Sequence, residues 1–373
     1  MQQYEDLHKI LEEFSHIRMA TEADNEAILK FYKNESMQTK EESISFARDP
    51  NFFDLYRLTT DTYWTFLFLN DDLSIGGMGS VLRHMRQLEN ESTPLAYFCD
   101  LRISHNAGRK ARVQWRQFFP RLVSALPRLE PSLACKSAYT AILANNDAAI
   151  NSLTKSGRGI TYRHLGTYYV KSHINTGLFP NDKFYTKEIS TEEFQSFYNK
   201  QNGTKFLSED TKYTHETLTK KHATFNNLGV FSQGNLIAIA RPVTKNITRR
   251  LKVQNLKGTK LQATKLLKLL GRPTPGSDGE LSTLELTYLT FAKALEKDDR
   301  DMVIESIWKW IKRSGLLREI HIINYVQETK EEDVSMLRQG IAFTTNGHLF
   351  EIHPEEEKGI LPKSSFRFEG AFL

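Results

Sequence analysis

The chain has 373 residues, a net charge of +5, 39% hydrophobic residues and 11% aromatic residues. This length and composition predict a globular protein with more than one domain. The longest apolar runs are too short to cross a bilayer, and the polar, acidic start does not resemble a signal peptide. We therefore expect a cytoplasmic protein with no membrane partner. The two cysteines, Cys99 and Cys135, lie in apolar runs, which disfavours a disulfide framework and a thiolate metal site.

Positive charge is concentrated in one part of the sequence. Residues 217–277 contain 12 Lys and Arg residues and no Asp or Glu, so the rest of the chain is net acidic. A chain polarised in this way attracts an anionic partner toward its basic segment, residues 241–272. A nucleic acid is one candidate for that partner, and a solvated basic surface without a partner is the alternative interpretation.

Hydrophobic periodicity and capping residues predict the elements of the first half. Apolar residues at helical spacing indicate helices, alternation indicates strands, and Asn or Asp before an apolar run indicates a helix start. In chain order we expect a helix at 4–14, a strand at 15–20, helices at 21–32 and 41–47, a hairpin of 63–69 and 74–82, a strand at 95–103, a helix at 107–126, a strand at 133–143, a helix at 144–157 and a strand at 160–170.

The second half repeats this order in outline. We expect a strand at 184–190, a helix at 191–199, a hairpin of 228–231 and 236–242, a basic strand-to-helix insertion at 245–270, a strand at 281–291, a helix at 298–314, a strand at 319–325, a helix at 331–338 and a final strand or pair of strands at 341–352. Repetition of one order of elements predicts two similar domains.

One stretch, residues 95–119, has the pattern of a phosphate site. An apolar strand runs into a helix through a short turn that contains Gly108 and the basic residues Arg109, Lys110 and Arg112. The start of a helix presents unpaired backbone N–H groups and the positive end of its dipole, and the basic side chains add full charges. This pattern favours an anion-binding turn, but strand–turn–helix units recur in every α/β protein.

The order of elements and two motifs resemble the GNAT superfamily of acyl-CoA-dependent N-acyltransferases. The run D-L-R-I-S-H-N-A-G-R-K-A-R, residues 100–112, is similar to the family's strand that leads into an R-G-x-G-x-G/A turn. The run N-D-A-A-I-N-S-L-T-K-S-G-R, with Asn146, Ala149 and Gly157, is similar to the family's later N-x-x-A-x-x-x-Y-x-x-x-G-F motif. The resemblance covers the chain except its first helix and its tail.

The resemblance implies an α/β (α+β) fold of two tandem GNAT-like domains, each a mixed, mostly antiparallel central sheet flanked by helices. In the second domain the counterpart of the turn contains four acidic residues within 296–301, which would repel a pyrophosphate. We therefore expect only the first domain to bind an acyl-CoA. The expected boundaries are an N-terminal helix at 1–14, a domain with the acyl-CoA site at 15–172, a linker at 173–183, a degenerate domain at 184–353 with the basic insertion 245–270, and a tail at 354–373.

By the same resemblance the chain is an N-acyltransferase, in the first place an N-acetyltransferase. The amine of a small molecule or peptide would attack acetyl-CoA, or another acyl-CoA co-substrate, directly and without a metal. Asp100 is the carboxylate nearest the implied reaction centre and is the candidate catalytic base. Its alternative is a strand-end aspartate that faces solvent or pairs with Arg102. The residues implied to bind the acyl-CoA are Leu101, Ile103, Gly108, Arg109, Lys110, Ala111, Arg112 and Asn146.

Two departures from the family pattern bear on turnover. Lys110 and Arg112 stand where the family keeps small residues that let the pyrophosphate approach the backbone, so their side chains would have to assist the anion. Leu153 replaces a tyrosine that often protonates the leaving thiolate, and leucine cannot donate a proton. Two alternatives therefore stay open: a non-catalytic acyl-CoA-binding or scaffold protein, and an aminoacyl-tRNA-dependent transferase that uses residues 241–272.

Overall fold

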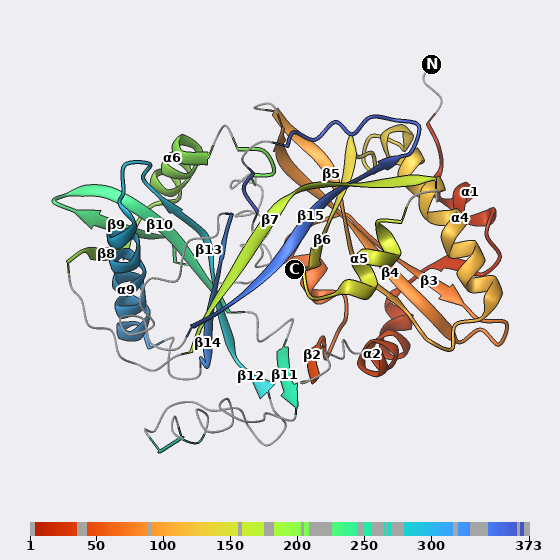
Figure 1. The fold of residues 1–373 in the computed structure, drawn as a ribbon, viewed down its shortest axis with the longest axis horizontal. Coiled ribbons are helices and arrows are strands. Elements are labelled where there is room, and N and C mark those ends of the chain that lie inside the picture. Colours follow the sequence, from red (N-terminus) through yellow and green to blue (C-terminus); the bar gives the residue numbers. More distant parts are fainter. Residues whose placement is uncertain are drawn as a thin grey trace.

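The computed structural model describes residues 4–35, 43–88, 91–155, 159–174, 183–202, 205–208, 226–244, 250–254, 265, 268–269, 280–315, 320–328, 342–363 and 366–368. Most of this part of the chain is organised around one twelve-stranded sheet, with helices on both faces (Figure 1). A three-stranded sheet lies below it in the view of Figure 1.

The first half of the chain supplies one side of the large sheet. Its elements are α1 Leu7–Glu12, β1 Ile17–Met19, the short 3₁₀ helix η1 Glu22–Asp24, α2 Asn25–Asn34, β2 Ser43–Ala47, α3 Asp54–Thr59, β3 Tyr63–Leu69, β4 Ile75–Leu88, β5 Glu91–Ile103, α4 Arg109–Ala125, η2 Leu126–Arg128, β6 Ser137–Leu143, α5 Asp147–Leu153 and β7 Ile160–Ile174. The helix expected after residue 144 is confirmed, and Asn146 caps it by accepting a hydrogen bond from the Ala149 amide at 3.1 Å.

The second half supplies the other side. Its described elements are β8 Tyr185–Glu188, α6 Thr191–Asn202, β9 Leu228–Ser232, β10 Asn235–Thr244, β11 Arg250–Gln254, β12 Glu280–Leu281, β13 Thr283–Phe291, α9 Lys297–Arg313, β14 Ile322–Gln327 and β15 Ala342–Pro354. The hairpin β9–β10 turns at Gln233 and Gly234, whose φ angles are 50° and 82°. Two successive positive φ angles give the turn the twist that matches paired strands.

One expected element is wrong. Residues 43–47 form strand β2, not part of a helix, and β2 pairs with β11, with Phe46 opposite Leu251. The physical reason is visible in S-I-S-F-A, where Ile44 and Phe46 alternate with small residues at the period of a strand. Helix α3 was not expected at all. The helix predicted at 331–338 and most of the basic insertion lie outside the described residues, so those predictions stay untested.

The strand order of the large sheet is β1-β3-β4-β5-β6-β15-β7-β14-β13-β10-β9-β8. Strand β15, from the end of the chain, lies between β6 and β7, so both halves contribute to the centre of one sheet (Figure 1). Neighbouring strands are antiparallel except for β5–β6 and β13–β14, which are parallel. The two parallel pairs therefore occupy matching positions on either side of the central strands β15 and β7.

Helices cover both faces of the sheet in each half. In the first half, Phe66 packs with the helices α1 and α4, whereas its neighbour Leu67 packs with α2 and α3. In the second half, Ala238 packs with α9, whereas Ile239 packs with α6. Adjacent residues of a strand face opposite sides of a sheet, so each half is a three-layered unit.

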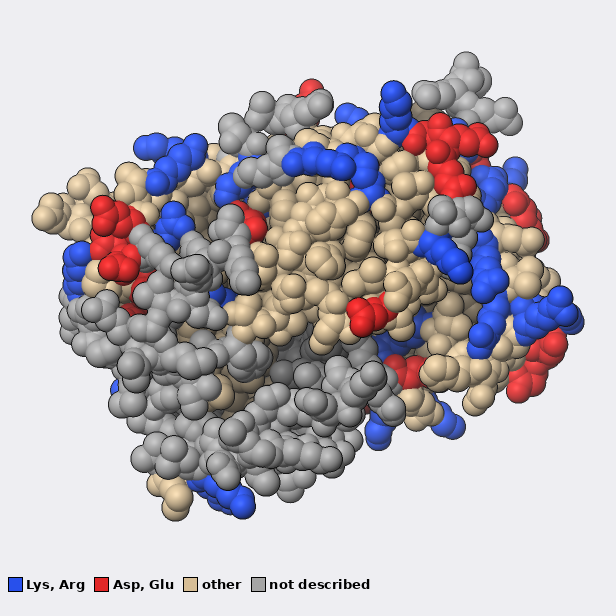
Figure 2. All heavy atoms as spheres, in the orientation of Figure 1, with Lys and Arg blue, Asp and Glu red and all other residues tan. Residues whose placement is uncertain are grey.

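The described end of the chain packs onto the first half. Phe366 and Phe368 are buried in the same cluster as Tyr168, and the rings of Tyr168 and Phe368 lie 4.9 Å apart. On the face shown in Figure 2, charged side chains gather at the right-hand rim, over α1 and α4, and are sparse over the central strands. None of the helices in the described part of the chain is long and apolar enough to cross a membrane.

Candidate active site

The parallel strands β5 and β6 diverge toward their carboxyl ends. They are paired from Leu95 opposite Ser137 to Phe98 opposite Thr140, and β5 then continues to Ile103 without further pairing to β6 within residues 91–155. On its other edge β5 bulges, because the register with β4 shifts between Met78 and Ser80. The result is an opening between β5 and β6, which we call the first-half opening.

Asp100 lies at the bulge and has a φ angle of 50°. A positive φ angle is strained for a residue with a side chain, and such strain is found where surrounding contacts hold the backbone in place. Those contacts are hydrogen bonds to the Asp100 carboxylate: Oδ1 accepts from the Tyr32 hydroxyl at 3.1 Å, and Oδ2 accepts from Tyr56 at 2.5 Å and from Arg48 at 2.7 Å. The bulge therefore places the Asp100 carboxylate in a polar cluster with Tyr32, Tyr56 and Arg48.

The Asp100–Arg48 pair is largely withdrawn from water, with side chains that are 12% and 2% exposed. Burial alone would lower the pKa of the Arg48 guanidinium, but nearby groups, with Asp100 the largest contributor, more than offset this and raise that pKa. Burial, followed by the charge of Asp100, raises the pKa of Tyr56 well above its usual value. Tyr56 is therefore a neutral hydrogen-bond donor to Asp100.

Arg102 is not the partner of Asp100. Its guanidinium lies 3.5 Å from the centre of the Tyr32 ring and donates to the backbone carbonyl of Glu35 at 2.5 Å. Arg102 thus fixes the end of helix α2, and Tyr32 in turn reaches Asp100. The alternative in which Asp100 pairs with Arg102 is wrong, and the partner is Arg48.

The turn after β5 presents the start of helix α4. Gly108 is the residue at the N-cap, and its amide donates to Asn70 Oδ1 at 2.7 Å. The next three amides, of Arg109, Lys110 and Ala111, donate to no acceptor in the described part of the chain. These are the free donors that a helix start offers to an anion. The predicted strand–turn–helix unit is confirmed, with its amides in the expected place.

The three basic side chains of the turn have different roles. Arg112 folds back and donates to the backbone carbonyls of Ser104, His105 and Ala107, so it ties the turn together. Lys110 is exposed and pairs with Asp71 at 3.0 Å, and hydrogen bonds from Lys110 and then His16 lower the pKa of Asp71.

Arg109, by contrast, is exposed and has no ion-pair partner among the described residues. The charge of Arg112 thus stays beside the helix start, while Arg109 and Lys110 have their side chains at the surface.

The other residues implied by the resemblance flank the opening. Leu101 and Ile103 belong to the part of β5 that has left β6, and Ile103 is exposed. Asn146 follows the end of β6, where its side chain caps α5. The three residues therefore lie on the two strands, or next to the ends of the two strands, that form the opening.

Sequence reasoning missed Arg48, Tyr32, Tyr56 and Asn70. Each lies at least 30 residues before the motif that it supports, and only folding brings it there. Arg48 follows a segment expected to be helical, and Tyr56 lies in the unexpected helix α3. A local pattern could not have identified them, because their role depends on the pairing of distant strands.

The second half repeats the opening with different side chains. Strands β13 and β14 pair from Thr283 to Leu286, after which β13 continues to Phe291. The register of β13 with β10 shifts at Tyr288, whose φ angle is 55°. Helix α9 then starts with Asp298 and Asp299 in its first turn. We call this the second-half opening.

Among the described residues, no group of three or more His, Cys, Asp or Glu side chains is placed to hold a metal ion. Cys135 is buried, which raises the pKa of its thiol to about 12, and both cysteines are free. The Cys135 thiol is therefore not activated as a ligand.

No known family profile and no curated protein sequence matches the chain. Solved structures do match. A glucosamine N-acetyltransferase region of a fungal multi-domain GH3 β-N-acetylglucosaminidase is similar with a TM-score of 0.57 at 10% identity, over 90% of this chain and 38% of that chain. Saccharomyces cerevisiae N-myristoyltransferase with bound myristoyl-CoA has a TM-score of 0.54 at 11% identity, over 91% of this chain and 80% of that chain. The chain therefore has the tandem GNAT-like fold of N-acetyltransferases and N-myristoyltransferases.

Proposed function

We propose that the chain is an N-acyltransferase that transfers an acyl group from acyl-CoA to an amine, with acetyl as the first candidate for that group. The observation that carries this proposal is the first-half opening, where a strand bulge, diverging parallel strands and unpaired helix-start amides occur together. The fold shared with N-acyltransferases supports it.

In this proposal the start of α4 binds the pyrophosphate. The free amides of Arg109, Lys110 and Ala111 donate to phosphate oxygens, and the positive end of the helix dipole adds to their effect. Arg109 contributes a full charge at the surface. Arg112 contributes mainly by holding the turn in shape, because its guanidinium is engaged with backbone carbonyls.

The acyl and pantetheine portions lie in the opening between β5 and β6. The backbone of Leu101 and Ile103, which has no partner on β6, is available to the thioester carbonyl and the pantetheine arm. Asn146 approaches from the β6 side. The amine nitrogen forms a bond to the thioester carbon, the carbon–sulfur bond breaks, and the thiolate leaves with a proton taken from water, since Leu153 has none to give.

Asp100 is the proposed catalytic residue for the acceptor. Its carboxylate already accepts hydrogen bonds from Tyr32, Arg48 and Tyr56, so both of its oxygens are engaged within the protein. An ionised carboxylate can still attract an ammonium group and orient the amine after water removes its proton. We therefore propose that Asp100 binds and orients the acceptor amine, and that it takes the proton only through water.

Thermal unfolding of the full chain with acetyl-CoA and with longer acyl-CoAs tests binding. We expect a saturable rise in melting temperature, because a ligand at 100 times its Kd stabilises the native state by about 2.7 kcal/mol. Absence of a shift with every acyl-CoA up to millimolar concentration would contradict the proposal.

Release of free thiol on addition of amines then separates an enzyme from a binding protein. The scaffold alternative is favoured by one observation, the leucine at position 153. It predicts the thermal shift without amine-dependent thiol release. The alternative that involves residues 241–272 concerns a segment that lies mostly outside the described residues.

A further inference from the structure

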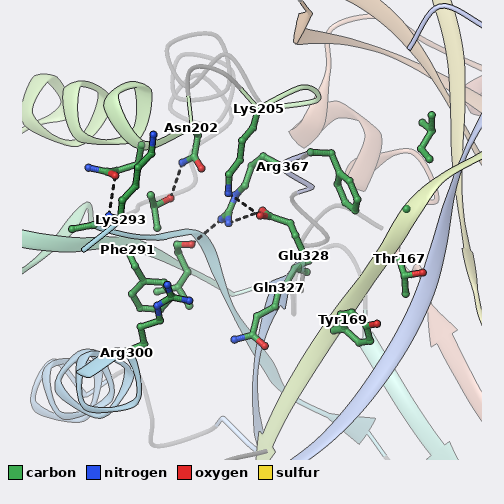
Figure 3. Close-up of a pocket in the computed structure, with 18 of the residues that line it drawn as sticks. Thr167, Tyr169, Asn202, Lys205, Phe291, Lys293, Arg300, Gln327, Glu328 and Arg367 are labelled. Carbon is green, nitrogen blue, oxygen red and sulfur yellow. Dashed lines mark hydrogen bonds and ion pairs between the residues drawn. The ribbon is translucent and has the colours of Figure 1, made fainter. Parts of the chain in front are cut away.

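The second-half opening contains a cavity of 680 Å³ (Figure 3). It lies where β13 and β14 diverge, and its walls come from the ends of these strands, from β7, from the start of α9 and from the described end of the chain. This volume is in the range of sites that hold small organic molecules. The cavity thus has the same position in the second half as the first-half opening has in the first, but different residues line it.

The cavity is strongly basic. One carboxylate, Glu328, faces five cationic side chains in its lining, which are Lys205, Lys293, Arg300, Lys363 and Arg367. Lys205 and Arg367 converge on Glu328 at 2.8 and 3.1 Å, as Figure 3 shows, so the single carboxylate is shared between two cations. The cluster therefore retains an excess of positive charge that a ligand can neutralise.

Two of the cations are available to a ligand. Lys293 and Lys363 are both exposed, and neither has an ion-pair partner in the part of the chain that the structure describes. Arg300 lies over the Phe291 ring and donates to the backbone carbonyl of Leu295 at 3.3 Å, which holds its charge at the wall of the cavity. Long side chains at the rim can close on an anion without repacking the core.

The rest of the lining is suited to an organic molecule. Its apolar part comes from Leu165, Leu289, Phe291, Ala292, Val326 and Phe366. Thr167 and Tyr169 lie across from the cations, on β7 (Figure 3). Asn202 is buried and donates to Thr290 at 3.1 Å, which gives the floor a fixed polar group. A ligand here would meet cations and apolar side chains in one cavity, because the two kinds of residue alternate along its walls.

The charge at the helix start distinguishes this site from the first. At α9 the N-cap is Glu296 and the first turn contains Asp298 and Asp299, and carboxylates at a helix start disfavour a bound pyrophosphate. The cations instead lie within the opening itself. An anion that uses the opening alone is favoured over one that needs the helix start.

We infer that the second-half opening is a binding site for a small organic anion, a phosphate monoester or carboxylate with an apolar portion, and not for CoA. This site is separate from the proposed acyl-CoA site, so its existence does not depend on the proposed reaction. Binding should weaken as salt is raised, because the rim cations are exposed and screened.

Calorimetric titration of the full chain with three probes tests this inference. Hexyl phosphate should bind more tightly than hexanoate, because it carries more negative charge on the same apolar chain, and hexylamine should not bind. Saturable binding of hexylamine with an affinity equal to that of hexyl phosphate, or binding of none of the probes, would overturn the inference.

The double variant Lys293→Glu, Lys363→Glu locates the binding. We expect at least about a tenfold loss of hexyl phosphate affinity, because two rim cations become carboxylates. The matched control Lys155→Glu, Lys187→Glu makes the same charge change on exposed residues outside the cavity and should leave the affinity within about twofold.

A third variant, Gly108→Glu, separates this site from the start of α4. Hexyl phosphate binding that survives Lys293→Glu, Lys363→Glu but is lost in Gly108→Glu would place the anion in the first half and overturn the inference. Ala292→Phe, which fills the opening without changing charge, should also weaken binding; retained affinity there, with a native melting temperature, would count against the cavity.

Discussion

The first-half and second-half openings share a backbone design and differ in charge. Each has a bulge with a positive φ angle, at Asp100 and at Tyr288, and each bulge lies beside a buried arginine. In the first half Arg48 pairs with the Asp100 carboxylate, whereas in the second Arg241 stacks over the Tyr288 ring at 5.1 Å and donates to Asn227 at 2.9 Å. The same strained backbone is therefore held in place by an ion pair in one half and by aromatic and amide contacts in the other.

The starts of the two helices also carry opposite charges. Helix α4 begins with Gly108 and basic residues, and α9 begins with Glu296 and acidic residues. In the first half the cations lie at the helix start and the carboxylate lies at the bulge, and in the second half the cations line the opening. The fold thus sets where a ligand can enter, while the charge at each position selects which ligand enters.

Exchanging the N-cap residues of the two helices should have the largest effect on acyl-CoA binding. Gly108→Glu should weaken acyl-CoA binding by on the order of 100-fold, because hydrogen bonds to a charged group contribute about 1.5–3 kcal/mol each and the new carboxylate repels the phosphates. Glu296→Gly, the matched change at α9, should leave the affinity unchanged. Equal losses in both variants, measured by calorimetry, would remove the distinction between the two helix starts.

Asp100→Asn should be the next largest effect. Asparagine keeps the shape of the side chain but cannot attract an ammonium group, so we expect kcat/KM for the amine to fall by about 10- to 100-fold with little change in acyl-CoA affinity. Tyr288→Phe, at the matching bulge, should leave kcat/KM unchanged. An Asp100→Asn enzyme with normal turnover would show that the carboxylate is structural only.

Stability measurements separate a role of Asp100 in the reaction from a purely structural role. Asp100→Asn leaves Arg48 buried without its charge partner, which should cost about 3–5 kcal/mol of unfolding free energy. The double variant Arg48→Met, Asp100→Asn removes both charges and should recover most of that loss in urea unfolding. Recovered stability without recovered turnover would assign Asp100 to the reaction, and recovery of both would contradict the proposed role.

A smaller effect is expected at Glu328 in the second-half cavity. Glu328→Gln frees Lys205 and Arg367 from their shared carboxylate, so hexyl phosphate should bind about threefold to tenfold more tightly, a change on the order of 1 kcal/mol. The exposed control Glu356→Gln should have no effect on this affinity. Weaker binding in Glu328→Gln, with the fold intact by circular dichroism, would contradict an anion site.

A pH dependence of stability is also expected, and it arises in the first half. Burial, followed by the charge of Arg86, lowers the pKa of His84 well below its usual value. Below about pH 6.5 the unfolded chain therefore binds a proton that the folded chain does not, and stability falls with pH by up to about 1.4 kcal/mol per unit. Urea unfolding at pH 7 and pH 5 should show this loss, and His84→Gln should reduce it while exposed His8→Gln should not.

Local signals made much of the first-half site predictable from the sequence. Gly108 with its basic neighbours marked a helix start, and Asn146 marked the next one, because caps and turns depend on residues close in the sequence. The alternation of apolar residues also predicted most strands of the large sheet. These parts of the fold can be predicted without knowing the contacts between distant residues.

The remainder depends on contacts between distant residues. Asp100 meets Arg48 across 52 positions, and no local pattern connects these two residues. The place of β15 between β6 and β7 is likewise fixed by pairing across the whole chain. The second-half cavity draws its cations from separate segments, so no single stretch of sequence could have indicated it.

Hydrogen–deuterium exchange of the full chain with and without acetyl-CoA tests the central claim most directly. We predict that acetyl-CoA slows exchange in peptides covering residues 100–112, where the amides of Arg109, Lys110 and Ala111 would gain acceptors, and leaves residues 289–301 unchanged. Protection confined to residues 289–301, with none at the start of α4, would contradict the assignment of the acyl-CoA site to the first half.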